Sequence, residues 1–337
     1  MKKLISILAI SLLLFSCEKG NEIESHTYQG EALGTTYMVR YFSDDKLEFE
    51  RSLDSIMDEI NSSMSTYITK SDISRINRGD TTVIVDEHFV KVFSASERIY
   101  KETDGFFDPT VGVLVNAYGF GPGKPLKKID SVKLDSLINL VGFDKINIKE
   151  ERSIQKEDPS VYLDFNAIAK GYAIDVIAEY LESERVDNYL IELGGELRAK
   201  GRNLENENSW VVGIDDPNQA EGERKLYAKV QLENSAMATS GNYRKFREDS
   251  ITGQKYVHTI NPITGKAERS NLLSASVLAE NCMLADGYAT AFMALGFERT
   301  KEVLKELDNV EAFLMYSTED GKMKVFSTPG FEKNLVE

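Results

Sequence analysis

The order of strand-like and helical segments constrains the fold of this chain more than any other feature. Alternating apolar residues predict strands, and apolar residues at helical spacing predict helices. Strands are predicted at 26–42 (a bent hairpin or two short strands), 161–163, 188–192, 196–200, 210–214, 226–232, 255–260, 273–278, 310–316 and 322–327, and helices at 47–64, 86–103, 109–118, 168–184, 285–295 and 300–307. The two types do not alternate strictly, so the pattern favours an α+β fold, with mixed sheets and packed helices.

Two element boundaries in this pattern involve acidic side chains. The helix at 109–118 is expected to begin with Asp108 as its N-cap and Pro109 at its first helical position. The strand at 161–163 is expected to lead through a turn of small residues into the helix at 168–184. No internal repeat, low-complexity linker or domain boundary interrupts residues 26–337, so one folded domain is expected there.

The N-terminus has the pattern of an export signal. A basic start precedes an apolar run at 4–15, which is followed by Ser16-Cys17. The run is shorter than the roughly 20 residues that cross a bilayer, so residues 1–16 are expected to be cleaved and Cys17 to carry a lipid. Residues 17–25 would form a short tether, and the folded domain would lie in the cell envelope, outside the cytoplasm and anchored to a membrane. The alternative is an ordinary signal peptide with an incidental Cys.

Charge and cysteine content narrow the class of protein. Removal of residues 1–16 leaves 38 Lys and Arg of the original 40 against 55 Asp and Glu, a formal charge of −17. A chain this acidic is not expected to bind nucleic acid, which requires a basic surface. A site for an anionic cofactor would therefore need a metal ion or a focused Lys. Apart from Cys17 only Cys282 remains, so no internal disulfide can form and the core must stabilise the fold.

The segment 163–172, LDFNAIAKGY, is the most informative motif. A strand ends in Asp164, small residues form a turn, and a helix begins with Lys170 in its first turn. Free amides at a helix N-terminus favour an anion, and Lys170 would add a positive charge. Asp164 could accept hydrogen bonds from a ribose or a base. The alternative is an N-capping acid with an exposed Lys.

A second motif lies at 282–291, where Asp286 and Thr290 are four residues apart and share one helix face. A carboxylate and a hydroxyl are hard oxygen ligands of the kind that Mg²⁺ prefers when phosphates complete its coordination shell. Asp286 would be costly to bury unpaired among apolar neighbours. The alternative is an Asp held by backbone amides and a Thr bonded to its own helix.

The third candidate is His258, which ends a strand before an Asn-Pro turn and could act as a base toward a hydroxyl nucleophile. A structural His bonded to a backbone carbonyl is the alternative. Aromatic residues beside glycines at 64–67 and 105–110 could enclose a flat ring, although an ordinary core has the same composition. The chain has no dinucleotide-binding G-x-G-x-x-G, P-loop, C-x-x-C or H-E-x-x-H motif, which removes the corresponding enzyme classes.

These segments, in this order, resemble the ApbE family of flavin transferases over about residues 30–297. The matching pieces are 33–37 (LGTTY), 65–67 (STY), 105–111 (GFFDPTV), 164–171 (DFNAIAKG), 193–196 (LGGE), 239–241 (TSG), 258–262 (HTINP) and 285–290 (ADGYAT). The resemblance implies the ApbE-like α+β fold and a Mg²⁺-dependent site for FAD.

Site residues are implied by position in the family motifs. The metal ligands would be the carbonyl of Ala167, the carboxylate of Asp286 and the hydroxyl of Thr290, and His258 would be catalytic. The FAD contacts would be Leu33, Tyr67, Phe106, Phe107, Asp108, Asp164, Lys170 and Ile260. Leu33 stands where many members have Met, and this swap preserves an apolar contact.

The resemblance also implies a reaction: transfer of FMN from FAD to a Thr or Ser hydroxyl of a client flavoprotein, with release of AMP. Mg²⁺ and Lys170 would draw charge from the pyrophosphate, and His258 or an acid near the metal would accept the proton. The clients would be flavin-carrying subunits of membrane electron-transport complexes. Hydrolysis of FAD to FMN and AMP, or FAD binding without catalysis in the periplasm, are the alternatives.

Overall fold

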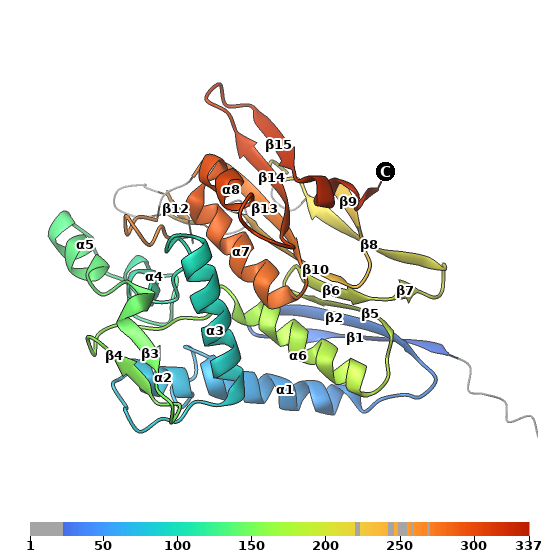
Figure 1. Ribbon diagram of the computed structural model, residues 1–337, viewed down its shortest axis with the longest axis horizontal. Helices are drawn as coiled ribbons and strands as arrows, with labels where there is room; N and C mark the ends of the chain where they lie inside the picture. The colour runs from blue at the N-terminus through green and yellow to red at the C-terminus, as the bar shows by residue number, and fades with distance from the viewer. Residues whose placement is uncertain are drawn as a thin grey trace, which may run out of the picture.

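An eight-stranded antiparallel sheet forms the centre of the protein in the computed structural model (Figure 1). The structure describes residues 23–219, 223–241, 246–248, 255–257, 259–267 and 270–336. The strands of this sheet, in spatial order, are β1 (Glu24–Ala32), β2 (Thr35–Ser43), β5 (Asn188–Leu193), β6 (Glu196–Lys200), β10 (Ser235–Gly241), β13 (Leu272–Ala279), β14 (Glu311–Ser317) and β15 (Met323–Ser327). Consecutive strands β1 and β2, β5 and β6, and β14 and β15 form hairpins.

Four long helices lie side by side over one face of this sheet (Figure 1). They are α1 (Phe49–Met64), α3 (Glu87–Glu102), α6 (Ala169–Ser183) and α7 (Cys282–Leu295). The main hydrophobic core lies between the helices and the sheet, and it includes Val39, Ile191 and Val277 from the strands. The helix α7 is apolar on nearly all sides because it packs against β10, β13, α3 and α6.

A smaller sheet covers the opposite face. Its strand order is β16 (Leu335–Val336), β9 (Leu226–Leu232), β8 (Asn208–Asp215) and β7 (Arg202–Asn203), and the short helix α9 (Pro329–Glu332) precedes β16. A second core fills the space between the sheets, and Phe42 and Trp210 belong to it. Strand β2 shows the alternation that a sheet covered on both faces requires, since Tyr41 points to the helices and Phe42 to the smaller sheet.

The remaining elements lie beside the helices. They are α2 (Asp72–Asn77), α4 (Gly112–Tyr118), α5 (Ser131–Ile138), the 3₁₀ turn η1 (Phe143–Lys145), β3 (Ile146–Ile148), β4 (Ile154–Lys156), β11 (Phe246–Glu248), β12 (Lys255–Val257) and α8 (Phe297–Val303). A third small core joins α4 and α5 to Ile260 and Ala267. No helix within the described ranges is long and apolar enough to span a membrane.

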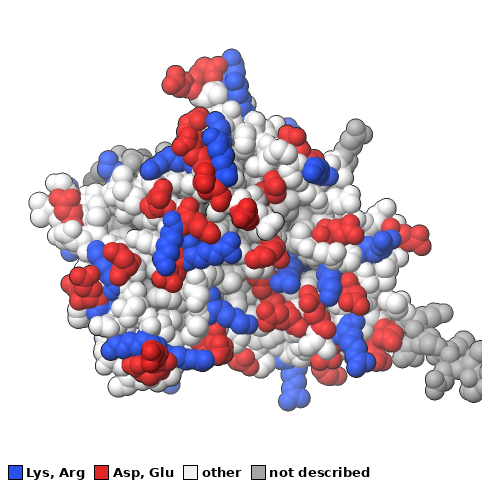
Figure 2. All heavy atoms as spheres, viewed as in Figure 1, with Lys and Arg blue, Asp and Glu red and all other residues white. Residues whose placement is uncertain are grey.

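On the surface, acidic and basic side chains are interspersed over the face that carries the helices (Figure 2). Helix α3 provides two such pairs, Arg98 with Glu102 at 3.0 Å and Lys101 with Glu97 at 2.9 Å. Exposed pairs of this kind contribute little to the free energy of unfolding. The two cores on either side of the central sheet therefore carry most of the stability.

The structure confirms the α+β fold class and the mixed sheets with packed helices. The hairpin predicted at 26–42 is β1 and β2, and the closing hairpin at 310–327 is β14 and β15. The boundaries 1–16, 17–25 and 26–337 stay predictions, since residues 1–22, Cys17 among them, lie outside the described part of the chain.

The strand predicted at 161–163 is wrong. The segment is extended but makes only an isolated bridge between Tyr162 and Val111. Side chains take the place of a neighbouring strand: Asn77 donates to the Leu163 carbonyl and accepts from the Leu163 amide, both at 2.8 Å, and Lys156 donates to the Val161 carbonyl at 2.9 Å. These contacts come from residues distant in sequence, which a local pattern does not reveal.

The helix start predicted at Asp108 and Pro109 is also wrong. Helix α4 begins at Gly112 with Val111 as its N-cap. The Asp108 carboxylate accepts hydrogen bonds from the amide of Thr110 at 2.7 Å and from its hydroxyl at 2.6 Å. The acid therefore stabilises a turn that precedes the helix. The elements α2, α5, α9, β3, β4, β7, β10, β11 and β16 were not predicted.

Candidate functional site

Two turns and a helix N-terminus meet at one end of the central sheet. The β1–β2 turn contains Leu33, the β5–β6 turn contains Gly194-Gly195, and α6 begins at Ala169. The amide of Gly194 donates to the carbonyl of Thr36 at 3.0 Å, which joins the two turns. Gly194 has φ +66, and a Cβ atom there would lie 2.8 Å from the Thr35 side chain, so both the conformation and the space require glycine.

Lys170, in the first turn of α6, lies between two buried carboxylates. Its Nζ is 2.6 Å from Oε1 of Glu196 and 3.7 Å from Oδ2 of Asp286. Burial acts to lower the pKa of Lys170, but the charges of Asp286 and Glu196 outweigh burial and raise this pKa above its ordinary value. The ammonium is therefore charged, and the alternative of an exposed Lys is wrong.

Asp286 is almost completely buried on α7, and its Oδ2 accepts a hydrogen bond from the amide of Gly171 at 3.1 Å. Burial raises the pKa of Asp286 to about 7, with Glu196 acting in the same direction and Lys170 against it. The alternative interpretation of Asp286 is an acid held by backbone amides, and the amide of Gly171 is a partner of that kind. The contact with Lys170 goes beyond that alternative, because it places a positively charged ammonium group 3.7 Å from the carboxylate.

Thr290 follows Asp286 by one turn on α7, as the spacing predicts. Its Oγ1 lies 3.5 Å from the hydroxyl of Ser240 on β10. The third implied ligand, Ala167, is half-buried in the turn that enters α6. No group of three or more His, Cys, Asp or Glu side chains that could hold a metal occurs within the described residues.

The donors present nevertheless fit a hard divalent cation. The carboxylate of Asp286 and the hydroxyl of Thr290 are oxygen ligands, and backbone carbonyls and ligand phosphates can supply the rest of a magnesium shell. A second observation agrees: Oε2 of Glu196 is buried and has no hydrogen-bond partner within the described residues. An unpaired buried carboxylate oxygen is costly, so the site holds uncompensated negative charge that a cation would neutralise.

Asp164 and Tyr67 form another part of the site. The buried Asp164 accepts a hydrogen bond from the amide of Asn166 at 2.8 Å, and burial raises its pKa to about 6. Tyr67 is 61% exposed although it is a large aromatic residue. Burial, followed by the charge of Asp164, raises the pKa of the Tyr67 hydroxyl. An exposed aromatic ring and a buried acid suit recognition of a flat polar ligand.

The residues Phe106, Phe107 and Asp108 are buried instead of lining an open surface. The guanidinium of Arg299 lies 4.6 Å from the centre of the Phe106 ring. A Cβ atom at Gly287 would lie 3.7 Å from the Phe107 ring, so this stretch packs next to Asp286 on α7. Burial raises the pKa of Asp108 to about 6.

Ile260 and Leu33 are the remaining residues predicted to contact FAD. Ile260 is buried in the third core with Leu114 and Tyr118, and Leu33 is half-buried with φ 49 in the β1–β2 turn. His258 lies outside the described residues, so its catalytic role stays a prediction.

The site also contains residues to which the sequence gave no role. Glu196 belongs to the matching LGGE segment. The sequence feature that could have indicated it is an acidic residue directly after a Gly-Gly turn, at the start of a largely buried strand. Asp175 caps α7, because its carboxylate accepts hydrogen bonds from the amides of Cys282 at 2.9 Å and Met283 at 2.8 Å. Arg198 pairs with Asp175 at 2.6 Å and holds this cap in place.

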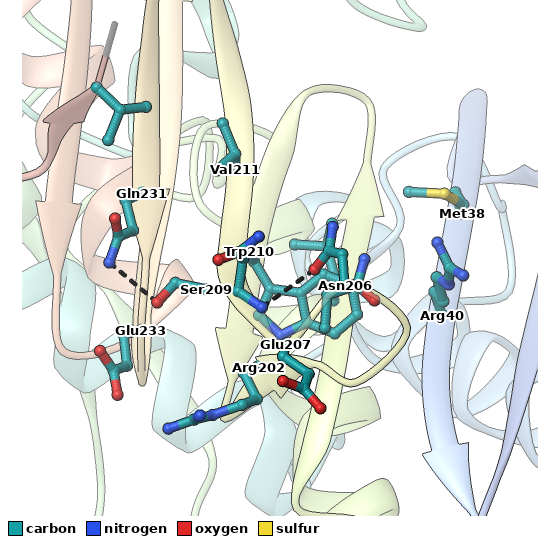
Figure 3. A pocket seen from close by; sticks show the side chains of 14 residues that line it. Met38, Arg40, Arg202, Asn206, Glu207, Ser209, Trp210, Val211, Gln231 and Glu233 are labelled. Carbon is teal, nitrogen blue, oxygen red and sulfur yellow. Dashed lines mark hydrogen bonds between the residues drawn. The ribbon is translucent and has the colours of Figure 1, made fainter.

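An open groove of about 610 Å³ lies away from these residues, between β2 and the smaller sheet (Figure 3). Met38 and Arg40 reach it from β2, and Ser209, Trp210 and Gln231 reach it from β8 and β9. The Gln231 amide donates to the hydroxyl of Ser209 at 2.9 Å. None of the predicted site residues lines this groove, so we place the candidate site at the Lys170–Asp286 end of the sheet.

Together, the charged Lys170, the carboxylate and hydroxyl oxygens on α7 and the exposed Tyr67 are features expected of a site for a flat, phosphate-bearing ligand. The comparisons agree with a site of this kind. The model of the ApbE family matches residues 33–314, and the chain belongs to this family.

Curated relatives and solved structures extend the match over almost the whole chain. The chain is 38% identical to an FAD:protein FMN transferase of Haemophilus influenzae, with 95% of each chain covered, and 34% identical to one of Vibrio cholerae, with 99% covered. The crystal structure of the flavin transferase ApbE from Vibrio cholerae superposes with a TM-score of 0.82 at 31% identity, covering 93% of this chain and 100% of that one. The apo flavinyl transferase ApbE of Pseudomonas stutzeri gives 0.81 at 28% identity, covering 93% and 97%. The ApbE-like fold is thereby confirmed.

Proposed function

We propose that this protein is an FAD:protein FMN transferase that depends on Mg²⁺ and attaches FMN to a Thr or Ser hydroxyl of a client flavoprotein, releasing AMP. The names of its relatives support the transferase activity. The observation that carries the proposal is the contact of Lys170 with Asp286 and Glu196 at the start of α6. It brings the positive charge of Lys170 and oxygen atoms suited to a metal together within one small region.

Electrostatics explain why both a Lys and a metal are needed. The pyrophosphate of FAD brings about two negative charges to a chain of strong net negative charge. Asp286, Thr290 and the carbonyl of Ala167 would hold the metal, and a bound Mg²⁺ would neutralise the pyrophosphate and make AMP a better leaving group. Lys170 would contact the phosphates from the side of α6 through its ammonium group.

The rest of FAD would extend from the pyrophosphate across the neighbouring segments. The exposed ring of Tyr67 would pack on the isoalloxazine, and Asp164 would accept hydrogen bonds from a ribose or base. Because the side chains of 106–108 are buried, this stretch would approach FAD through its backbone and ring edges. Leu33 and Ile260 would supply apolar contacts.

The transfer step makes one phosphorus–oxygen bond and breaks another. The client hydroxyl oxygen attacks the phosphorus on the FMN side, and the bond between that phosphorus and the AMP oxygen breaks. His258 accepts the proton of the hydroxyl, or an acid near the metal does so. The products are AMP and FMN joined to the client through a phosphoester.

Hydrolysis remains the second candidate, because water could replace the client hydroxyl at the same phosphorus and give FMN and AMP. Binding of FAD without catalysis is the third. Asp286 and Thr290, one turn apart with their oxygens at the site, favour the catalytic candidates. Incubation with FAD and a client domain separates the three: a flavin-labelled client band on a denaturing gel indicates transfer, free FMN indicates hydrolysis, and unchanged FAD contradicts both reactions.

The proposed location suits such clients. A lipid on Cys17 would anchor the domain to a membrane outside the cytoplasm, beside electron-transport complexes whose flavin-carrying subunits would be modified. Strand β1 begins at Glu24, near the tether, and ends at the turn that contains Leu33. Its nine residues span about 30 Å. The site would therefore lie at the far end of this strand from the lipid, where a client domain can reach it.

A further inference from the structure

Glu196 is the buried acid of the site that has no role in the metal or FAD contacts described above. Its side chain is only 8% exposed. One carboxylate oxygen accepts from Lys170 at 2.6 Å, and the other is buried without a hydrogen-bond partner among the residues that the structure describes. A buried carboxylate oxygen without a hydrogen-bond partner is costly, so the position of Glu196 requires an explanation.

The surrounding turn holds Glu196 firmly in place. Glu196 pairs with Leu193 across the tight β5–β6 turn, and the carboxylate of Glu192 accepts from the amide of Gly195 at 2.7 Å. A Cβ atom at Gly194 would lie 3.3 Å from the unpaired oxygen of Glu196, so the turn packs directly against that oxygen. The carboxylate is therefore a fixed point, whereas Lys170 has a long flexible side chain.

Lys170 has two carboxylates within reach, and a metal ion would compete with it for one of them. Nζ of Lys170 lies 3.7 Å from Oδ2 of Asp286. A divalent cation on Asp286 would repel the ammonium at this distance, since both are positive and the site is buried. The ammonium would then need another counter-charge to stay in the site, and Glu196 is the nearer carboxylate.

We propose that Glu196 is a positioning residue that holds Lys170 away from Asp286, so that Asp286 can bind the metal while Lys170 remains available for the pyrophosphate. This inference rests on the proposed function, because it assumes the metal at Asp286. Without the charge of Glu196, Lys170 would pair with Asp286 and the metal would have to displace it. Glu196 would thus act on the metal through Lys170 and not as a ligand.

The test is a double-mutant cycle read out by Mg²⁺ binding without FAD. Mg²⁺ alone is titrated calorimetrically into the wild-type protein, E196Q, K170M and E196Q/K170M, and the Mg²⁺-induced rise in Tm is recorded for each. E196Q should weaken Mg²⁺ binding by about 10- to 100-fold, as loss of a residue that orients a metal ligand does. K170M should bind Mg²⁺ at least as tightly as the wild type, because no ammonium competes for Asp286. In that background most of the E196Q effect should disappear.

Two results would overturn the inference. E196Q could bind Mg²⁺ as tightly as the wild type, or it could lose the same factor with and without Lys170, which would make Glu196 a direct ligand. The proposed function fails separately, if the wild-type protein attaches no FMN to a client in the presence of FAD and Mg²⁺.

Two further variants complete the design. E97Q is the matched control, because Glu97 is also a Glu paired with a Lys, at 2.9 Å from Lys101, but lies exposed on α3; its Mg²⁺ affinity should equal that of the wild type. E196D keeps the charge but shortens the side chain, and it replaces E196Q in the cycle if E196Q does not fold. If E196D lowers the Mg²⁺ affinity less in the K170M background than in the wild-type background, the inference is supported. An equal loss of Mg²⁺ affinity in both backgrounds contradicts it.

Discussion

The amide of Gly171 donates a hydrogen bond to the carboxylate of Asp286 at 3.1 Å. This contact joins the first turn of α6 to the middle of α7, the two helices that carry Lys170 and the metal candidates. It is possible because Gly171 has no side chain: a Cβ atom there would lie 2.3 Å from the carbonyl oxygen of Cys282. The close approach of two helix backbones therefore sets the geometry of the site.

Gly171→Ala should consequently damage both stability and metal binding. The added methyl group meets backbone, which cannot rotate away, so α6 and α7 must separate. We expect the free energy of unfolding to fall by about 1–3 kcal/mol, as for other overpacked cores, and Mg²⁺ binding to weaken. Denaturant unfolding and Mg²⁺ titration measure the two effects.

Gly321→Ala provides the control for this variant. Gly321 has a positive φ, unlike the helical Gly171, and nothing lies within 4 Å of a Cβ atom there. That variant should lose some stability through backbone strain and should bind Mg²⁺ like the wild type. Equal Mg²⁺ binding in both variants would show that the contact between α6 and α7 does not position Asp286.

Asp164→Asn should make the protein more stable at neutral pH. Burial raises the pKa of Asp164 from 3.8 to about 6 in the folded protein, so the folded state binds the proton more tightly than the unfolded state. The stability from this protonation is fully present below about pH 4 and is lost as the pH rises through 6. Asn has no carboxyl group to ionise, so the variant avoids this loss of stability. The rise of about two units in the pKa of Asp164 corresponds to at most about 3 kcal/mol in the free energy of unfolding at pH 7–8.

Thermal unfolding of both proteins between pH 4 and pH 8 checks this prediction. The difference between Asp164→Asn and the wild type should shrink toward zero near pH 4. A difference that does not change with pH would mean that Asp164 does not carry the raised pKa. FAD affinity should fall in the same variant, because a buried acid that lowers the stability of the folded protein at neutral pH is expected to contact the ligand.

The sequence predicted the grouping of Asp286 and Thr290 on one helix better than it predicted the segments around the candidate site. The four-residue spacing of Asp286 and Thr290 fixes their common helix face, so local geometry alone brings these oxygens together. The role of Glu196 depends on Lys170, which is 26 residues away in sequence. No local pattern contains that contact, although the LGGE segment was visible.

The same reasoning explains the errors in the fold. The apolar residues at 161–163 resemble a strand, but Asn77 and Lys156 supply the hydrogen bonds instead of a neighbouring strand. Strand β10 was missed because its small and hydroxyl-bearing residues lack a strong strand pattern. It is a strand because β6 and β13 pair with it on both sides.

Tyr67→Ala should weaken FAD binding without changing stability. The ring is 61% exposed and contributes little to the core, so the free energy of unfolding should change by less than about 0.5 kcal/mol. Loss of an aromatic contact with the flavin should weaken FAD affinity by about 2- to 10-fold. Quenching of flavin fluorescence measures the affinity, and Tyr67→Phe should behave like the wild type. Unchanged affinity in Tyr67→Ala would place the isoalloxazine elsewhere.

Removal of the metal or of its carboxylate should abolish the reaction. Treatment with EDTA should leave negligible labelling of a client, and added Mg²⁺ should restore it. Asp286→Ala should lose labelling permanently, because the remaining carbonyl and hydroxyl ligands carry no charge to hold Mg²⁺. Labelling of a client by Asp286→Ala, detected as flavin fluorescence on a denaturing gel, would contradict the metal assignment.

Cys17→Ala should separate location from catalysis. Without the thiol no lipid can be attached, so the protein should move from the membrane fraction to the soluble fraction when cells are fractionated. Its activity with FAD and a soluble client domain should equal that of the lipidated protein, because β1 places its nine residues between the tether and the Leu33 turn. Labelling of a membrane-bound client in cells should fall, since the enzyme is no longer concentrated at the membrane surface. Retention of Cys17→Ala in the membrane fraction would show that another feature holds the protein there.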